Sequence, residues 1–332
     1  MRENLRQMVK SSPLLMRIAR PLSHIKTVGL MHIPITGPLP PVSEKAHLDA
    51  VSFGSFAQFQ EWTTANGDRI AEWECEDEGA FRPGKDPFSL RGLCAICNAI
   101  VDFRTTIENG KENSVGETRP NWREGLICPQ CGMCNRVRAA LHLAIQNFDL
   151  TPDKQIYTTE QVGLVYRWLR GHFTHVLGSE YLPPGQVPGF RRLGINHQDV
   201  QALSLAAASV DCVITLDVLE HVPDHSAAFA SFARVLRPGG RLVITAPFTI
   251  NKFDTTVRAE MLRDGRIKHF MPEEIHGNPL DPSGSLCFRH FGWDVLEQLT
   301  EAGFADPGVH VYHNRYLGYL GGQQSLISAI KA

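Results

Sequence analysis

Apolar residues in the C-terminal half of the chain follow two alternating patterns. Between residues 151 and 332, short apolar runs typical of strands alternate with segments whose apolar residues repeat every three or four positions, as in amphipathic helices. Strands that alternate with helices predict an α/β fold with a parallel sheet. The expected strands are 155–159, 174–179, 212–216, 241–246, 309–313 and 324–330, and the expected helices include 162–173, 226–236 and 293–302.

The N-terminal half is patterned differently. Ser43 is a fair N-cap, and the apolar residues that follow it up to Trp62 recur at helical spacing, which predicts a helix over 43–62. The acidic cluster at 72–78 is expected to be a solvated linker. Residues 1–42 hold six prolines, with six basic residues up to Lys26 against one acid. We expect a poorly ordered arm there, with contact to anionic lipid as the alternative.

Residues 88–150 contain two C-x-x-C pairs, Cys94 with Cys97 and Cys128 with Cys131, separated by 30 residues. Each pair can present two sulfurs to one metal, and two pairs complete the tetrahedral site that suits zinc. The pattern resembles a zinc-ribbon or treble-clef module and predicts a closed, structural zinc site followed by a helix. Cys134 could replace one ligand, and redox-active or simply buried thiols are the alternative.

The chain thus divides into a basic, proline-rich arm (1–42), a helical or linker segment (43–87), the cysteine-rich module (88–150) and the α/β domain (151–332). The net charge of −2 provides no global field toward nucleic acid or membranes. No apolar run is long enough to span a bilayer, and Leu14-Leu15-Met16 is too short for the core of a signal peptide. We therefore expect a cytoplasmic protein whose eight cysteines are thiols or metal ligands.

Residues 211–248 carry the most specific motif, DCVITLDVLEHVPDHSAAFASFARVLRPGGRLVITAPF. It reads as a strand ending at Asp217, a loop with Glu220 and His221, a helix, a Pro-Gly-Gly turn and a second strand. This segment resembles class I S-adenosylmethionine-dependent methyltransferases, in the subgroup with an LEHVPD-type loop and an L-R-P-G-G turn. The resemblance implies a Rossmann-like sheet, mostly parallel with an antiparallel last strand, and S-adenosyl-L-methionine bound at the carboxyl ends of the strands.

The same resemblance assigns roles to residues near those strand ends. Glu180 matches the acidic residue that accepts hydrogen bonds from both ribose hydroxyls. Asp199 and Val200 match the segment at the adenine edge. The usual G-x-G-x-G loop of the family is missing, so either side chains keep the cofactor further from the backbone, or Glu160 and Gln161 contact its amino and carboxylate groups.

Methyl transfer to a small-molecule or glycan acceptor is the expected activity, and Asp217 could hold the cofactor or the acceptor. His221 is the candidate general base, because its reference pKa is near neutral, with a packing or capping role as the alternative. The insertion of about forty residues after Phe248 is expected to cover the acceptor. Its histidines, His269, His276 and His290, have no metal-ligand spacing.

Two other functions remain open at this point. The first is an RNA methyltransferase whose cysteine-rich module holds the RNA; Trp122, Arg123, Arg136 and Arg138 could form a stacking and phosphate-binding surface. This is the weaker hypothesis, because the basic excess between residues 82 and 138 is small. The second is a non-catalytic binding protein on a degenerate methyltransferase fold.

Overall fold

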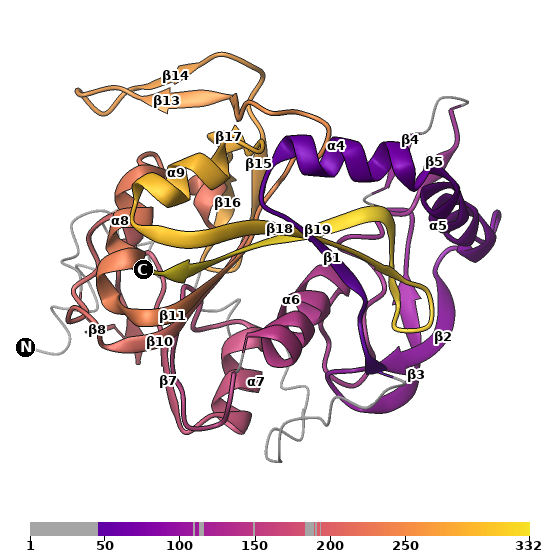
Figure 1. Cartoon of the computed structure of the whole chain (residues 1–332), viewed down its shortest axis with the longest axis horizontal. Coiled ribbons are helices and arrows are strands. Elements are labelled where there is room, and N and C mark those ends of the chain that lie inside the picture. The colour runs from indigo at the N-terminus through magenta and orange to yellow at the C-terminus, as the bar shows by residue number, and fades with distance from the viewer. Residues whose placement is uncertain are drawn as a thin grey trace, which may run out of the picture.

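A seven-stranded sheet forms the centre of the computed structural model, which describes residues 46–332 except 109, 113–115, 149, 183–188, 190 and 193 (Figure 1). In spatial order the strands are β1 (Ala50–Phe53), β18 (Phe304–Asn314), β19 (Tyr319–Lys331), β11 (Leu236–Thr245), β10 (Val210–Leu216), β6 (Gln155–Thr158) and β7 (His175–Gly178). β7, β6, β10 and β11 run parallel, whereas β19 is antiparallel to both β11 and β18, and β1 is antiparallel to β18. The predicted mostly parallel sheet with an antiparallel last strand is confirmed.

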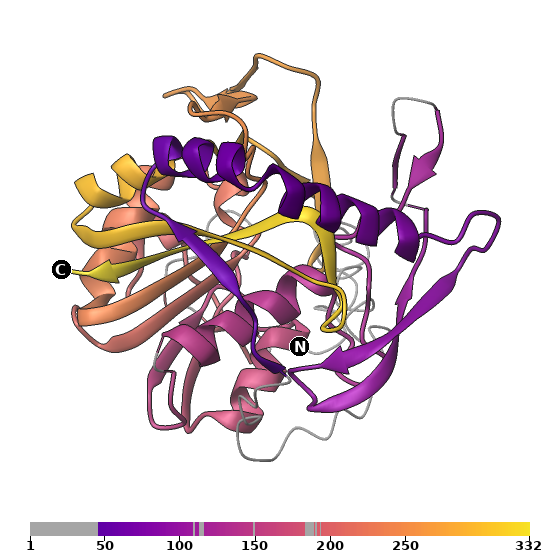
Figure 2. The same cartoon turned by 45° about the vertical axis from the view of Figure 1, so that its right-hand side comes forward.

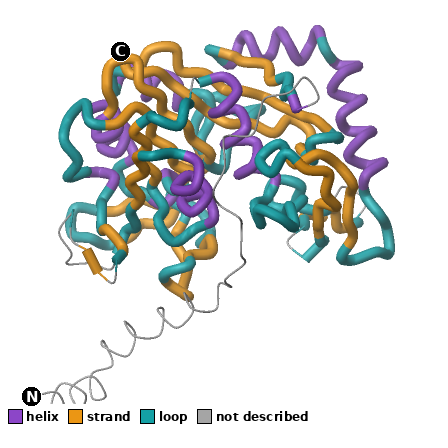
Figure 3. The backbone as a smooth tube through the Cα atoms, turned by 90° about the horizontal axis from the view of Figure 1, so that it is seen from below, coloured by secondary structure: helices purple, strands orange, loops and turns teal. Residues whose placement is uncertain are grey.

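Side chains alternate along each strand between two hydrophobic cores, one on each face of the sheet. The first core joins Ile156, Ile214 and Val243 to α6 (Asn135–Asn147) and α7 (Leu164–His172), and it includes the thiols of Cys94, Cys128 and Cys131. The second core packs α8 (His225–Val235) and α9 (Val295–Glu301) on the other face. In the tube view, strands run through the middle of the α/β part (Figure 3). The predicted helices of the C-terminal half are confirmed.

Short antiparallel pairs complete the described structure. β2 (Phe88–Cys94) and β3 (Ala99–Thr105) form the hairpin of the cysteine-rich module, and β4 (Lys111–Glu112) pairs with β5 (Thr118–Arg119). β8 (Arg191–Arg192) pairs with β9 (Ile195–Asn196). The insertion after Phe248 forms three pairs: β12 (Thr256–Val257) with β17 (Arg289–His290), β13 (Ala259–Met261) with β14 (Ile267–His269), and β15 (Ile275–Asn278) with β16 (Asp281–Leu286). The β13–β14 pair projects away from the sheet (Figure 1).

The helix predicted over 43–62 is wrong in its first half. Residues 50–53 form β1, which pairs with β18 in the register Ala50↔Tyr312 and Phe53↔Val309. Helix α4 (Phe56–Ala65) begins after Ser55, whose hydroxyl accepts a hydrogen bond from the backbone N–H of Gln58. Helical spacing was a poor guide here, because β18 offered an unpaired edge and tertiary pairing overrides a local preference.

The acidic cluster at 72–78 is also not a linker. It lies within α5 (Gly67–Ala80), which packs on β19 and crosses the β1–β19 side of the sheet together with α4 (Figure 2). Asp77 is buried, and its Oδ1 accepts hydrogen bonds from His313 Nε2 and from the backbone N–H of Gly321, each at 3.0 Å. Because the other acidic side chains of the cluster are more exposed, the sequence did not reveal that Asp77 is a buried acceptor.

The expected arm at 1–42 lies outside the described residues. Within the described part of the chain, no helix combines the length and apolar character needed to cross a bilayer.

Replacing Asp77 with alanine should lower the free energy of unfolding by about 1–3 kcal/mol, because the buried donors at His313 and Gly321 lose their acceptor. Urea unfolding followed by circular dichroism measures the change. Glu74→Ala on the exposed face of α5 is the matched control and should shift the free energy by less than about 0.5 kcal/mol. Equal effects of the two variants would contradict the role assigned to Asp77.

Candidate active site

The carboxyl ends of the four parallel strands open at one edge of the sheet, where α/β folds bind ligands. A cavity of about 880 Å³ lies beyond the ends of β10 and β11. Three parts of the chain line it: the cysteine-rich module, the loops that follow the two strands, and the insertion. Its lining residues are Asn121, Arg123, Glu124, Arg136, Asp217, His221, Pro247, Phe248, Thr249, Ile250, Asn251, Glu274, His276, Gly277 and His290.

Glu180 and Asp199 lie near one another around Tyr157, a buried residue of β6. Burial raises the pKa of the Tyr157 hydroxyl, and the two carboxylates raise it further, so both are close enough to act on it. The Tyr157 hydroxyl is held by Ser179 Oγ at 2.7 Å. Val200, next to Asp199, is buried in the second core. The backbone of Glu180 pairs with His197 and accepts a hydrogen bond from Gln198 N, which places Glu180 beside the segment that carries Asp199.

Glu180 is partly engaged by the protein itself. Its Oε1 accepts hydrogen bonds from the backbone N–H groups of Gln161 at 2.6 Å and Val162 at 2.8 Å. Burial raises the pKa of this carboxyl to about 7, even though the two N–H groups favour the ionised form. Asp199 accepts from the backbone N–H of Gln201 at 2.9 Å.

Glu160 and Gln161 form the turn that replaces a glycine-rich loop. Glu160 Oε1 accepts from the backbone N–H of Tyr166, near the start of α7. A Cβ at Gly163 would come within 2.1 Å of that oxygen, so the Glu160 side chain would have to move to admit a larger residue. The Gln161 side chain joins the next loop, donating to Gly194 O and accepting from Asn196 N. Both side chains hold the protein's own backbone, and their contacts with a cofactor stay predictions.

Asp217 ends β10 and is paired rather than free. Arg123 binds it through two hydrogen bonds of 2.7 Å, and Thr245 Oγ1 donates to it at 2.9 Å. Burial opposes its ionisation, but Arg136 and Arg123 outweigh this effect and lower the pKa of Asp217 to about 2. Asp217 therefore acts first as the anchor for two arginines of the cysteine-rich module. A direct contact with cofactor or acceptor stays a prediction.

His221 lies in the wall of the cavity, on the loop after β10. Its Nδ1 is 2.8 Å from the backbone carbonyl of Leu286, which can only accept, so Nδ1 carries the proton. Nε2 is then left with a lone pair, 3.7 Å from Glu220 Oε1. The side chain is therefore oriented by the insertion and can accept a proton through Nε2.

The four predicted zinc ligands are gathered at the turn that joins β2 to β3. Cys97 Sγ is 3.8 Å from Cys128 Sγ, and Cys94 Sγ is 4.0 Å from Cys131 Sγ. All four sulfurs lie within 4.8 Å of one another. A tetrahedral zinc–thiolate site with bonds of about 2.3 Å has sulfurs about 3.8 Å apart, so the donor set fits zinc.

Cys134 lies apart from this group and contacts Glu124 Oε2 at 3.7 Å. Cys134 is the N-cap residue of α6. The alternative in which Cys134 replaces one of the four cysteines has no support in this geometry.

The surface suggested for RNA is not present. Arg138 is fully buried and donates to the backbone carbonyls of Leu126, Leu317 and Gly318. Trp122 is buried as well, and Arg123 and Arg136 pair with carboxylates. A sequence pattern of arginines around a tryptophan could not reveal that their partners lie far along the chain.

Sequence reasoning missed the contribution of the cysteine-rich module to the cavity. Asn121, Arg123 and Arg136 reach the ends of β10 and β11 because the module shares a core with the sheet. Residues 121–124 and 135–138 could have indicated this contribution, because each segment carries charged side chains that a purely structural metal module does not need.

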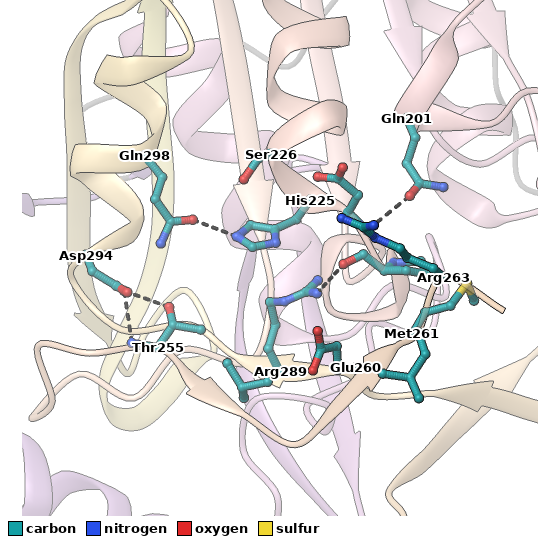
Figure 4. Close-up of a pocket in the computed structure, with 14 residues that line it drawn as sticks. Gln201, His225, Ser226, Thr255, Glu260, Met261, Arg263, Arg289, Asp294 and Gln298 are labelled. Atoms are coloured by element: carbon teal, nitrogen blue, oxygen red, sulfur yellow. Dashed lines mark hydrogen bonds between the residues drawn. The ribbon is translucent and has the colours of Figure 1, made fainter. Parts of the chain in front are cut away.

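A second hollow, of about 650 Å³, lies beside the start of α8 (Figure 4). His225 and Gln298 form a hydrogen bond of 2.6 Å in its wall, and Arg289 lines it as well. Among the described residues that line this hollow, none is a predicted site residue. Of the predicted catalytic and cofactor-binding residues, Asp217 and His221 line the larger cavity, whereas Glu160, Gln161, Glu180, Asp199 and Val200 line neither hollow.

Two relatives illustrate what the chain is similar to. It is 36% identical over 111 residues to a ubiquinone biosynthesis O-methyltransferase from Cupriavidus pinatubonensis, covering 32% of this chain and 43% of that protein. It is 51% identical over 49 residues to an uncharacterised protein of a Streptomyces fradiae transposon, covering 15% of this chain and 14% of that protein. The chain thus matches less than half the length of these relatives.

A solved S-adenosylmethionine-dependent methyltransferase from Mesorhizobium loti aligns with 58% of this chain and 98% of its own. The sequence identity is 17% and the TM-score is 0.36. The family model described as a methyltransferase domain matches residues 162–244. That match covers the segment from the turn after β6 through β11, where the sequence motifs lie. Residues 162–244 therefore match the methyltransferase domain family, in agreement with the resemblance to class I S-adenosylmethionine-dependent methyltransferases.

Proposed function

We propose that the protein transfers a methyl group from S-adenosyl-L-methionine to a small-molecule or glycan acceptor bound in the 880 Å³ cavity. The observation that carries this proposal is the backbone pairing of Glu180, at the carboxyl end of β7, with His197 and Gln198, which places Glu180 beside the segment that carries Asp199. The family match over residues 162–244 and the strand order support it.

The carboxylates fit the adenosine part of the cofactor. Carboxylate oxygens only accept hydrogen bonds, and ribose hydroxyls and an adenine amino group are donors. Glu180 would hold the ribose, and Asp199 with Val200 would lie at the adenine edge. Glu160 and Gln161 would contact the amino-acid part from their turn. The bound cofactor supplies an electrophilic methyl group.

The cavity favours a polar acceptor of limited size. Its described walls carry two arginines, three histidines and several carboxylates, with few large apolar side chains. Such a lining suits an acceptor rich in hydroxyl or amine groups, as in a glycan or a polar metabolite. We assign His221 the role of general base, because its Nε2 lone pair is available there.

We further propose that the four cysteines hold a structural zinc ion. The sulfurs share the first core with the sheet, so the metal would fix the module that delivers Arg123 and Arg136 to the cavity. Zinc would contribute folding free energy, on the order of 10 kcal/mol in small modules. With four protein ligands the site would be closed and would take no part in the reaction.

The Glu180→Ala variant should bind S-adenosylhomocysteine more weakly by about 1–3 kcal/mol, because the ribose hydroxyls lose their acceptor. Isothermal titration calorimetry measures the affinity, and Glu301→Ala, an exposed glutamate on α9, serves as the control. Unchanged affinity in Glu180→Ala would remove the ribose assignment. A folded wild-type protein that binds no cofactor would instead favour a non-catalytic binding protein.

Methyl transfer itself is tested with labelled S-adenosyl-L-methionine and fractionated cell extract. Label should enter a small-molecule or glycan fraction, and the His221→Ala variant should lower turnover at least about 100-fold with little change in cofactor affinity. His269→Ala, elsewhere in the insertion, is the control. Label recovered only in RNA would overturn the acceptor class, and equal losses of turnover and cofactor affinity would assign His221 a packing role.

The Cys97→Ser variant should lose the zinc ion and much of its folded yield, because one of four ligands is removed. Metal content by plasma mass spectrometry and melting temperature report the two effects. Cys75→Ser is the matched control, since that thiol is exposed on α5 and should leave both unchanged. A wild-type protein that folds normally without any metal would refute the zinc proposal.

A further inference from the structure

A buried carboxylate without a hydrogen-bond partner lies directly behind the cavity wall. Glu220 has no exposed side-chain surface, and neither Oε1 nor Oε2 has a hydrogen-bond partner among the described groups. The Arg289 guanidinium attracts this carboxylate electrostatically but donates its hydrogen bonds to the backbone carbonyls of Leu219, Val222 and Pro223. Burying a carboxylate without a hydrogen-bond partner costs free energy, and a cation bound beside Glu220 would offset this cost.

Two histidine nitrogens face the same carboxylate oxygen. His221 Nε2 and His276 Nδ1 are each 3.7 Å from Glu220 Oε1, beyond hydrogen-bond range. The three donor atoms all lie within 4.8 Å of one another. Ligands bound to a tetrahedral metal at about 2.0–2.1 Å are about 3.3 Å apart, so shifts of less than an ångström would close the set around one ion.

The remaining nitrogen of each histidine is bound in the way that prepares a metal ligand. His221 Nδ1 donates to Leu286 O at 2.8 Å, and His276 Nε2 is 2.9 Å from Glu274 Oε1. A metal-binding histidine commonly donates its other N–H to a carbonyl or carboxylate, which fixes the ring and directs the lone pair at the metal. The other nitrogen of each histidine, His221 Nε2 or His276 Nδ1, faces Glu220 Oε1.

A neighbouring set, Glu274, His276 and Cys287, is the weaker candidate. Glu274 already accepts from His276 and His290, and Arg258 lies 3.2 Å from its other oxygen. These contacts satisfy Glu274 and place a positive charge beside it, which disfavours a cation. Glu274 therefore orients His276, whereas the Glu220 carboxylate remains available to bind a cation.

We propose that Glu220, His221 and His276 form a binding site for a divalent first-row transition metal ion, such as Zn²⁺, Co²⁺ or Mn²⁺. Two imidazoles and one carboxylate suit these ions better than Mg²⁺, which prefers oxygen ligands alone. Three protein ligands leave coordination positions open, and both histidines line the cavity. If the proposed methyl transfer holds, the metal ion would replace the free imidazole of His221 as the group that activates an acceptor oxygen.

Cobalt binding tests this site without any substrate or cofactor. The full-length protein, carrying one equivalent of zinc in its cysteine site and no excess zinc, is titrated with Co²⁺ and followed by calorimetry and visible absorption. The wild type should bind one equivalent of Co²⁺, with weak d–d bands and without the intense thiolate charge-transfer band of a cysteine site. Binding of no equivalent, or binding with a thiolate spectrum, overturns the proposal.

Variants identify the ligands. His276→Ala and Glu220→Gln should each weaken Co²⁺ binding at least about tenfold. His269→Ala, on β14 of the same insertion, is the control and should bind as the wild type does. Because Glu220→Gln changes a buried group, its fold is checked by circular dichroism, and the half-buried His276→Ala decides the question if that variant fails to fold.

Wild-type affinity in His276→Ala would show that the cluster is only an ion pair between histidines and carboxylates, which contradicts the proposal. Failure of methyl transfer alone leaves the metal result intact, because the titration needs neither donor nor acceptor. Conversely, loss of metal binding with normal turnover would leave His221 as the general base.

Discussion

The ion pair between Asp217 and two arginines determines how the two parts of this molecule work together. Asp217 ends β10, whereas Arg123 and Arg136 come from the cysteine-rich module and the helix that follows it. The Asp217 carboxylate is largely buried, so removing either side would leave a charge without compensation, which typically costs about 3–5 kcal/mol. The pair therefore fixes the module over the strand ends and forms one wall of the cavity.

The shared core explains why the module is not a separate binding domain. Its thiols pack with the same face of the sheet as Ile156 and Ile214, and Arg138 is enclosed between α6 and the turn that joins β18 to β19. A metal that orders the module would thereby order Arg123 and Arg136 as well. This arrangement links metal binding by the cysteines to the shape of the proposed acceptor site, although the two lie in different parts of the fold.

The turn after β6 lacks a glycine-rich loop, and the side chains of Glu160 and Gln161 hold it in place instead. Glu160 occupies the space beside Gly163, and Gln161 joins the neighbouring loop through Gly194 and Asn196. Glu180 in turn accepts from the backbone of this turn. The proposed cofactor end of the site is therefore held by the protein's own hydrogen bonds, which would reduce the ordering cost of binding there.

The sequence by itself determined the strands that residues 151–332 contribute to the main sheet, their helices, the sheet type and the four-cysteine cluster, because each rests on local periodicity or on spacing within a short turn. It also located Asp217 and His221 at a strand end. Only the tertiary structure decided that residues 50–53 pair with β18 and that Asp77 and Arg138 are buried. The same holds for the cluster of Glu220 and His221 with His276, which lies 55 residues after His221 along the chain. Such contacts depend on the folding of distant segments against each other, and no local pattern encodes the distance between them.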